Sequence, residues 1–484
     1  MLSSILSASI FLAGAVRAVE YSTTRHISQY SPLETPLLPP ASFSSPMVSR
    51  TSRRASKAHA LHYLRASGIS AHTVPLTGAQ FDYEYLTDIS VGGQNLSVIV
   101  DTGSSDTWFP EMGFACFNLS GHPEPVSTCA FGSEGFDSRI SNSYQAYPNT
   151  TFSISYGDGE YLSGSAAFET VSVGGLTVKH QEIGVVSSAA WVGDGINSGL
   201  LGLAYPELTS VTNDIDHQDM KYNPFFFNAV KQKLVPYPYF SIALNRGTAA
   251  GTHSPAADPH LGYLAFGGIA PVPVTSTCTT VPIQGYSLTT RAPTADRHST
   301  YMYYTVDIHK YTFPNSSTVV TASNSTIIDS GTTLNLLPSE VAQAYNKGFG
   351  TWHDGLYYVD CAAQAPPFSV TLGGKTFSTD PQDQVVWVGT DKNGNDLCVS
   401  GTQDGGPQMM GSVFILGDVF MHNVVVTFDI QKNQMTFTQR KSCFHSIYVY
   451  HIRDNHPNSD NNPTYQTHRA YIPCASEHTS HPAE

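Results

Sequence analysis

The sequence predicts an all-β protein made of two related lobes, and three observations lead there. A β-branched run that ends in Asp-Thr/Ser-Gly occurs twice, as Val98–Ser105 and as Thr326–Thr333. An apolar segment around a glycine follows each run, as Gly199–Ala204 and as Val413–Asp418. Charged residues make up only 13% of the chain, whereas 39 glycines and 30 prolines favour short strands and turns over long helices. A chain of 484 residues is also long enough for two cores.

The duplication extends upstream of both Asp motifs. The segment Phe81–Ile89 matches Tyr301–Ile308 in its alternation of aromatic, acidic and β-branched residues. Three matched pieces in the same order indicate two copies of one lobe. Each copy ends its β-branched run on a single carboxylate, Asp101 in the first copy and Asp329 in the second.

The remaining elements follow from alternation with period two and from turn residues. Strands are expected at 84–91, 96–100, 151–156, 164–178, 239–244 and 262–268. The turn Tyr156–Gly159 joins two of these strands into a β-hairpin that could serve as a lid. Short helices are expected at 223–230, which begins with Pro224, and at 338–345. Residues 281–300, rich in Thr, Pro and Ser, are expected to form a loop.

The two Asp motifs have the composition that a buried carboxylate requires. A lone carboxylate is costly to bury unless it is hydrogen-bonded or neutralised, and a following glycine lets backbone N–H groups approach it. Hydroxyl groups beside it supply further donors. The residues of the two turns are Thr102, Gly103, Ser104, Ser330, Gly331 and Thr332. Asp101 and Asp329, if brought together, would share one proton and act as general base and general acid on a water molecule.

These motifs together resemble the pepsin-like aspartic proteinases over roughly residues 80 to 440. The resemblance is carried by both Asp-Thr/Ser-Gly turns, both apolar glycine segments and Tyr156-Gly157-Asp158-Gly159. It implies a bilobal pepsin-like fold, with a catalytic cleft between two β-lobes and a β-hairpin flap over the cleft. It also implies an acid endopeptidase with no metal and no cofactor. Ser330 replaces the commoner threonine and keeps its hydroxyl.

The resemblance also implies a role for individual residues. Asp101 and Asp329 would be catalytic, Ser104 and Thr332 would bond their outer oxygens, and Thr102 and Ser330 would brace the lobe junction. The flap and substrate-binding residues would be Trp108, Tyr156, Gly157, Asp158, Leu200, Gly331, Thr332, Thr333 and Ile415. Pockets of this family favour bulky apolar residues on both sides of the cut.

Asp158 is the specificity residue to test. Secreted relatives with Asp at this place accept Lys or Arg just before the scissile bond, so we expect measurable cleavage after Lys. The alternative is that the Asp158 carboxylate bonds only the flap backbone.

Three other classes of protein compete with this interpretation. A catalytically inert binding protein on the same fold would typically have lost an Asp or a glycine motif, and neither is lost here. A sugar-cleaving enzyme also uses paired carboxylates but does not explain the duplicated turn. A serine hydrolase would need a Gly-x-Ser-x-Gly elbow between a strand and a helix, and Gly164-Ser165 has no such context.

The N-terminal residues and the sequons predict secretion. Residues 1–18 contain an apolar run, Ile5–Val16, and end in Val16-Arg17-Ala18, as a cleaved signal peptide does, although a buried N-terminal helix is the alternative. No other stretch is apolar enough to span a membrane, and the polar tail offers no lipid-anchor signal. Glycosylation is expected at Asn95, Asn118, Asn149, Asn315 and Asn324. We expect a secreted, extracellular protein, with a vacuolar location left open.

Seven cysteines in an oxidising compartment imply disulfides. The family resemblance implies the pairs Cys116–Cys129 and Cys361–Cys398. The pairing of Cys278, Cys443 and Cys474 stays open at this stage. Metal binding is the competing interpretation, but the sequence has no matching ligand spacing.

Charge divides the chain into a basic leader and an acidic body. Residues 19–72 carry six basic and two acidic side chains, whereas the chain from 73 onward carries 17 basic and 36 acidic ones. A basic propeptide that inhibits the acidic body is therefore expected, with a solvated basic linker as the alternative. The expected divisions are 73–270 for the N-terminal lobe, 271–442 for the C-terminal lobe and 443–484 for a polar, partly disordered tail.

The net charge of −14 disfavours nucleic acid as a partner. We expect polypeptide substrates, the chain's own propeptide as an inhibitor, no membrane partner and a monomer. The physiological substrate, the mature N-terminus and the role of the tail do not follow from the sequence.

Overall fold

The computed structural model describes most of the body of the chain. The described residues are 21–22, 41, 43–47, 85–133, 135–156, 159–193, 195–246, 261–288, 299–314, 324–391, 394–407, 414–441, 445–451 and 466–472. Several expectations lie outside them: the signal peptide 1–18, most of the segment 19–72, Gly157, Asp158, Asn315, Cys443 and Cys474. Among the described helices, none is long and apolar enough to cross a membrane.

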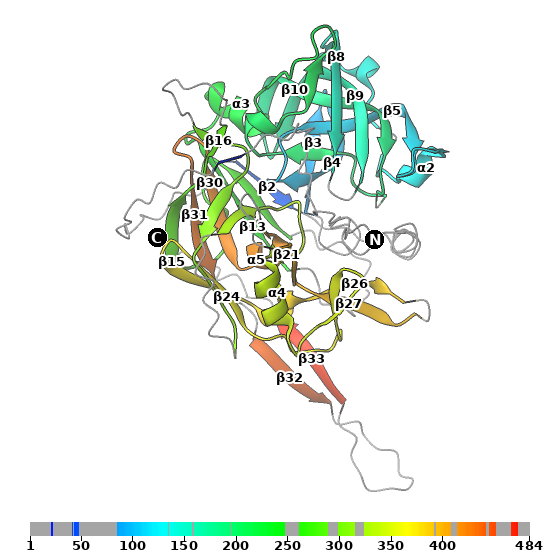
Figure 1. Ribbon diagram of the computed structural model, residues 1–484. Coiled ribbons are helices and arrows are strands. Elements are labelled where there is room, and N and C mark those ends of the chain that lie inside the picture. The colour runs from blue at the N-terminus through cyan, green and yellow to red at the C-terminus, as the bar shows by residue number, and fades with distance from the viewer. Residues whose placement is uncertain are drawn as a thin grey trace, which may run out of the picture.

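The N-terminal lobe is one large twisted sheet with short helices at its edges (Figure 1). Its strands are β3 (Leu86–Val91), β4 (Gln94–Asp101), β5 (Thr107–Phe117), β6 (Pro123–Glu124), β7 (Gln145–Ala146), β8 (Thr150–Ser155), β9 (Tyr161–Val173), β10 (Leu176–Ala190), β11 (Leu200–Gly202) and β12 (Val211–Asn213). Its helices are α2 (Val126–Cys129), η2 (Ser138–Ile140), η3 (Pro206–Leu208) and α3 (Phe225–Lys231).

The C-terminal lobe contains three smaller sheets. Its strands are β18 (Thr305–Ile308), β19 (Lys310–Thr312), β20 (Asn324–Ile328), β21 (Asn335–Leu337), β22 (Thr351–His353), β23 (Leu356–Val359), β24 (Phe368–Leu372), β25 (Lys375–Thr379), β26 (Val385–Thr390), β27 (Asp396–Ser400), β28 (Thr402–Asp404) and β29 (Phe414–Leu416). Its helices are α4 (Ser339–Asn346), η4 (Pro381–Gln384) and α5 (Asp418–Met421).

A six-stranded antiparallel sheet joins the lobes, with the order β15-β31-β30-β13-β14-β2. Its strands are β2 (Phe43–Met47), β13 (Tyr239–Leu244), β14 (Gly262–Phe266), β15 (Val274–Pro282), β30 (Val424–Asp429) and β31 (Gln434–Arg440). Both lobes therefore contribute to one continuous sheet. Strand β2 belongs to the expected propeptide and lies at the edge of this sheet. An edge strand can accommodate Pro46, which has no backbone N–H, because one side of the strand pairs with no neighbour.

The two lobes repeat one strand arrangement around their Asp motifs. In the N-terminal lobe the order is β10-β5-β11-β4-β3, and in the C-terminal lobe it is β28-β21-β29-β20-β18. The central pairs β4–β11 and β20–β29 are both parallel. Strands β3 and β18, which carry the matched upstream segments, are both antiparallel to the Asp-bearing strand. The duplication expected from the sequence is therefore present in the topology.

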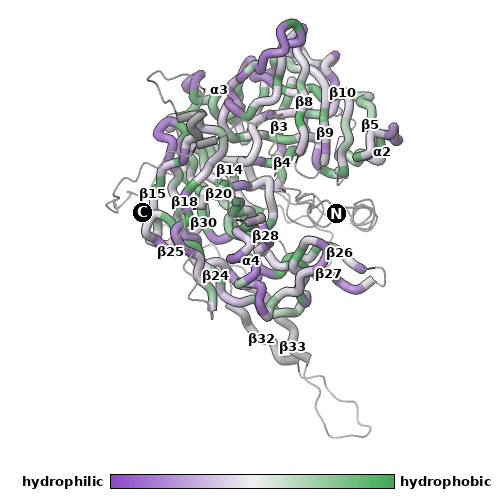
Figure 2. The backbone as a smooth tube through the Cα atoms, viewed as in Figure 1, coloured by the Kyte–Doolittle hydropathy of each residue, from purple (hydrophilic) through white to green (hydrophobic). Residues whose placement is uncertain are grey.

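Apolar residues fill the interior of both lobes and the sheet between them. In Figure 2 hydrophobic residues gather along the strands and hydrophilic residues gather at the turns. Phe240 of β13 stacks on Phe428 of β30 with ring centroids 4.7 Å apart, and Tyr304 meets Phe428 edge-on at 4.6 Å. The hydroxyl of Tyr304 donates to the Leu203 carbonyl at 2.7 Å, which links the lobes. Burial of these large rings stabilises the junction.

The structure corrects two of the expected elements. Residues 164–178 are not one strand, because β9 ends at Val173 and β10 begins at Leu176. Gly174 and Gly175 separate them with φ of 55° and 86°, the left-handed backbone of a tight hairpin turn. The expected loop 281–300 also contains regular structure: the end of β15, β16 (Tyr286–Leu288) and β17 (Ser299–Thr300). β1 (Tyr21–Ser22), β16 and β17 form a small three-stranded sheet.

The tail also departs from expectation. Strands β32 (His445–His451) and β33 (Gln466–Ile472) pair antiparallel as a hairpin within the segment for which we expected no regular structure. Figure 1 shows this hairpin projecting from the C-terminal lobe. The expected helices are present as α3 and α4, each shifted by one or two residues.

Candidate active site

Each Asp motif places its carboxylate at the end of a buried strand. Asp101 is the last residue of β4 and Asp329 follows β20 directly. The apolar residues directly before each aspartate, 98–100 and 327–328, are buried, and both strands pair on two sides inside a lobe. The aspartates are consequently only 7% and 8% exposed, in that order.

The turns after the two strands are tied to each other across the lobe junction. Thr102 Oγ1 donates to the Ile328 carbonyl at 3.0 Å, and Ser330 Oγ donates to the Val100 carbonyl at 2.8 Å. The Ser330 N–H donates to Thr102 Oγ1 at 3.0 Å, and the Thr102 N–H donates to Ser330 Oγ at 3.2 Å. These four reciprocal bonds hold the two strand ends in one fixed register, as expected for Thr102 and Ser330.

Each carboxylate receives the same pair of local donors. The Gly103 N–H donates to Asp101 Oδ1 at 2.6 Å, and the Gly331 N–H donates to Asp329 Oδ1 at 2.8 Å. The other oxygen accepts from a hydroxyl three residues later: Ser104 Oγ bonds Asp101 Oδ2, and Thr332 Oγ1 bonds Asp329 Oδ2 at 2.7 Å. The two half-sites are therefore chemically equivalent.

The glycines of the two turns let the aspartates face each other. A Cβ atom placed on Gly103 would lie 2.6 Å from both carboxylate oxygens of Asp329. A Cβ atom placed on Gly331 would lie 2.5 Å from Asp101 Oδ1. Any side chain at either position would therefore push the opposite carboxylate away.

Burial and mutual repulsion leave a proton on this pair. Burial, followed by the negative charge of Asp329, raises the pKa of Asp101 to about 8, although Ser104 and Gly103 partly oppose the shift. Asp101 consequently keeps its proton under acidic conditions. One carboxyl can then donate a proton while the other accepts one.

The hairpin β8–β9, which we call the flap, carries Tyr156 at the end of its first strand. The Trp108 indole Nε1–H donates to the Tyr156 hydroxyl at 2.8 Å. Trp191 packs edge-on against both rings, with centroids 5.3 Å from Trp108 and 5.8 Å from Tyr156. Burial raises the pKa of Tyr156 well above its usual range, so the hydroxyl keeps its proton. Trp108 and Tyr156 thus contact each other as expected, whereas Trp191 was not among the expected flap residues.

The matched glycine segments place two further expected residues. Leu200 lies in β11 opposite Trp108, and Ile415 lies in β29 opposite Leu336. Both side chains are almost fully buried beside the Asp-bearing strands. The carbonyl of Thr333 accepts from the Val419 N–H at 3.1 Å, which anchors the second turn to α5.

Asp418, at the start of α5, is a third buried carboxyl near the aspartate pair, and it was not among the residues expected at the site. It is 1% exposed, and among the described residues neither of its carboxylate oxygens has a hydrogen-bond partner. Burial, then the charges of Asp329 and Asp101, raise its pKa well above the usual range. Its backbone N–H donates to the Thr332 carbonyl at 2.9 Å. A third carboxyl thus lies within electrostatic reach of the pair, and an Asp inside the apolar run 413–418 was the available signal.

Two disulfides have the expected pairing. Cys116 bonds Cys129 with Cα atoms 5.9 Å apart, and Cys361 bonds Cys398 with Cα atoms 5.2 Å apart. Cys278 is a free, partly buried thiol.

Of the sequons within the described part, Asn95 and Asn149 are exposed and Asn118 is partly exposed. The described residues contain no cluster of three or more His, Cys, Asp or Glu side chains suited to hold a metal ion.

Comparison with known proteins agrees with this geometry. The eukaryotic aspartyl protease family model matches residues 84–440. A "probable aspartic-type endopeptidase" of Aspergillus fumigatus is 38% identical over 374 residues, which cover 73% of this chain and 78% of that protein. Rhizopuspepsin-1 of Rhizopus niveus is 32% identical over 74% of this chain and 79% of its own. The crystal structure of aspartic proteinase from Irpex lacteus has a TM-score of 0.56 at 23% identity and covers 74% of this chain and 95% of its own.

The family match spans both lobes and both Asp motifs. The structural likeness supports the bilobal pepsin-like fold independently of close sequence identity. The chain therefore belongs to the eukaryotic aspartyl protease family and is an aspartic-type endopeptidase.

Proposed function

We propose that Asp101 and Asp329 are the catalytic pair of a secreted acid endopeptidase. The observation that carries the proposal is the equivalent pair of donors on two buried carboxylates that face each other across two glycines. Two carboxyl groups that share one proton are the general arrangement of aspartic proteases.

The two carboxyls exchange the roles of acid and base during the reaction. The ionised partner takes a proton from a water molecule while the water oxygen attacks the peptide carbonyl carbon. The protonated partner donates its proton to the carbonyl oxygen, which gives a neutral tetrahedral diol. The carboxyl that took the water proton passes it to the amide nitrogen, while the other carboxylate takes a proton from a hydroxyl of the diol as the C–N bond breaks and the C=O bond reforms, so the pair returns to its starting state with one proton.

Substrate binding follows from the elements around the pair. An extended polypeptide would pair with the flap, including Gly157, and with the backbone of 331–333, while Tyr156 closes over it. Leu200 and Ile415 flank the pair from equivalent strands, so we assign bulky apolar residues to both sides of the cut. Asp158 lies outside the described residues, and its pairing with a Lys before the cut stays a prediction.

We further propose a monomeric zymogen that is secreted after removal of residues 1–18. Two disulfides and exposed sequons suit an oxidising extracellular compartment or a vacuole. Residues 19–72 would act as the inhibitory propeptide, and the pairing of β2 with β14 ties part of this segment to the body. The acidic surface leaves polypeptides as partners in preference to nucleic acid or membrane.

The alternative is a pepsin-fold protein that binds peptides without cleaving them. Inhibition by pepstatin separates the two, because this peptide places a hydroxyl where the tetrahedral intermediate forms. The expected result is hydrolysis of a denatured protein at acid pH that pepstatin abolishes. Binding of pepstatin without any hydrolysis by the processed protein would favour the inert alternative.

A further inference from the structure

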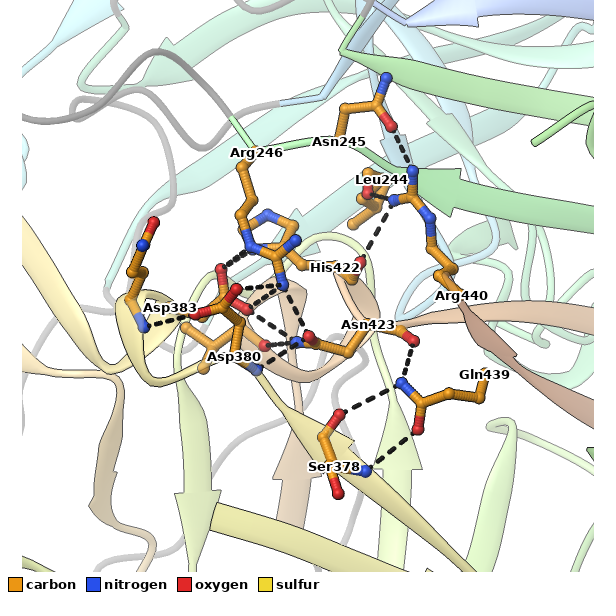
Figure 3. Close-up of polar contacts among 12 residues, drawn as sticks. Leu244, Asn245, Arg246, Ser378, Asp380, Asp383, His422, Asn423, Gln439 and Arg440 are labelled. Carbon is orange, nitrogen blue, oxygen red and sulfur yellow. Dashed lines mark hydrogen bonds and ion pairs between the residues drawn. The ribbon is translucent and has the colours of Figure 1, made fainter. Parts of the chain in front are cut away.

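A buried polar cluster lies at the lobe junction, and Figure 3 shows four of its members, Arg246, Asp383, His422 and Asn423. We call Tyr85, Arg246, Asp383, His422 and Asn423 the junction cluster. Tyr85 precedes β3, Arg246 follows β13, Asp383 belongs to η4, and His422 and Asn423 follow α5. Tyr85 is fully buried and His422 is 2% exposed. Burying this many polar groups is costly unless they bond one another.

His422 is the centre of the cluster. Its Nε2 lies 2.5 Å from the Tyr85 hydroxyl, and its Nδ1 lies 3.1 Å from Asp383 Oδ1. Arg246 holds Asp383 with two parallel bonds, from Nε to Oδ1 at 2.6 Å and from Nη2 to Oδ2 at 2.7 Å. Asn423 Nδ2 adds a bond to Asp383 Oδ2 at 2.7 Å. The carboxylate is therefore fixed, and it fixes the imidazole in turn.

Both ends of the Tyr85–His422 contact lead to the aspartate pair. The Tyr85 carbonyl accepts from the Val100 N–H at 2.9 Å, one residue before Asp101. On the other side, the His422 N–H donates to the Asp418 carbonyl at 2.8 Å. The Asp418 N–H then donates to the carbonyl of Thr332, whose hydroxyl bonds Asp329. One continuous path of hydrogen bonds thus joins the two half-sites through the junction cluster.

The reciprocal hydrogen bonds of Thr102 and Ser330 are one link between the lobes. We propose that the Tyr85–His422 contact is a second link, and that these two positioning residues keep the two aspartates correctly placed relative to each other. The inference rests on Asp101 and Asp329 being the catalytic pair. Neither positioning residue touches the reacting atoms.

The hydrogen bonds between Tyr85 and His422 depend on pH, because the number of protons on the His422 imidazole decides which of them can form. The Tyr85 hydroxyl has one proton but two neighbouring acceptors, the Asn245 carbonyl at 2.8 Å and His422 Nε2. Neutral His422, with its proton on Nδ1 toward Asp383, takes the Tyr85 proton. Protonated His422 donates from Nε2 to the Tyr85 oxygen, which frees the Tyr85 proton for Asn245. Only the protonated imidazole lets all three contacts form at once.

Burial and the charges that face His422 move this change to lower pH. Burial lowers the pKa of His422 below its usual value of 6.5, as do the positive charges of Arg246 and Arg440, while Asp383 opposes them. Arg440 approaches from β31 and donates to the His422 carbonyl at 3.2 Å. Asp380, from the segment before η4, lies 4.0 Å from Arg246 and adds a second negative charge behind it. His422 therefore gains its proton only at a lower pH than an ordinary histidine.

The test compares Tyr85→Phe with a matched control, Tyr345→Phe. Tyr345 in α4 is equally buried, and its hydroxyl donates to the Pro366 carbonyl at 3.0 Å within the C-terminal lobe alone. We expect Tyr85→Phe to lower kcat about tenfold with little change in KM, because misplaced catalytic groups slow the chemical step. The loss should grow as pH falls, since Phe removes the oxygen that accepts from the charged Nε2–H. Tyr345→Phe should keep kcat within about twofold of wild type.

Several outcomes would overturn the inference: kcat of Tyr85→Phe within about twofold of wild type at every pH, an equal loss in Tyr345→Phe, or a loss that does not vary with pH. If Tyr85→Phe does not fold, His422→Gln takes its place, because glutamine cannot titrate. The ratio of wild-type to His422→Gln kcat should then change with pH, and a constant ratio refutes the role of His422. Wild-type turnover and its pepstatin inhibition, measured alongside, test the catalytic pair separately.

Discussion

At the scale of single residues, the chemistry depends on keeping one proton on two facing carboxyls. Local donors favour the ionised form of Asp101, while burial and repulsion from Asp329 favour its protonated form. The balance raises the pKa of Asp101 to about 8, so this carboxyl keeps its proton throughout the acid range. A charged substrate side chain beside the scissile bond is bound favourably only if the protein places an opposite charge next to it.

Asp158 is the residue we expect to supply such a charge. Replacement by Thr should lower the ratio of cleavage after Lys to cleavage after Leu by roughly tenfold, since an ion pair is stronger in a closed cleft than on a surface. In the wild type the same ratio should fall as pH drops below about 4, where an ordinary Asp gains its proton. Two peptides that differ only in the residue before the cut measure both effects. The control is Asp88→Thr, an exposed carboxylate on β3, and an unchanged Lys/Leu ratio in Asp158→Thr would refute the pairing.

At the scale of elements, the features that could be predicted from the sequence are those formed by residues close together in the chain. The bonds to Asp101 and Asp329 come from two and three residues away in the chain, so the turns could be predicted in full. The Gly174-Gly175 turn carried a usable signal that the reading of 164–178 as one strand overlooked. The partners of His422 could not be predicted, because Tyr85 lies 337 residues away and only the folded chain brings the two together.

The register of the C-terminal hairpin predicts a third disulfide. His445 of β32 pairs with Ile472 of β33, and His451 pairs with Gln466. Two further steps outward along the same register reach Cys443 and Cys474, which lie outside the described residues. Residues directly opposite in an antiparallel pair have the Cα spacing that a disulfide needs. We expect peptide mapping under non-reducing conditions to link Cys443 with Cys474 and to find Cys278 alkylated, and a link from Cys278 to either would contradict this pairing.

At the scale of the whole molecule, the buried carboxyls Asp101 and Asp418 favour the folded state at acid pH. The folded-state pKa values of Asp101 and Asp418 lie above their unfolded values, so the folded state binds more protons than the unfolded chain. Their contribution is therefore lost as pH rises from about 4 towards 8. Asp383, whose pKa is lowered to about 2, has the opposite effect. Its ionised form stabilises the fold at neutral pH, and this contribution is lost as the pH falls below the ordinary pKa of an aspartate. His422, whose pKa is lowered, disfavours the fold below 6.5.

This balance predicts the behaviour of Asp418→Asn. The amide keeps the shape of the side chain and removes the charge that burial penalises at neutral pH. Its Tm relative to wild type should therefore be higher at pH 7 than at pH 4, whatever the absolute effect of the substitution. Thermal unfolding at the two pH values measures the difference. Equal differences in Tm at both values would show that Asp418 does not carry this penalty.

The most direct test of the catalytic pair is the turnover of Asp329→Asn beside that of Asp101→Asn. Asparagine preserves the size of each side chain but can neither accept nor hold the shared proton. With circular dichroism showing an intact fold, kcat on a peptide with apolar residues at the cut should fall about 10³-fold or more in both variants, because general acid–base catalysis is lost. A correctly folded variant of either kind that kept kcat within about tenfold of wild type would contradict the assignment of Asp101 and Asp329 as the catalytic pair.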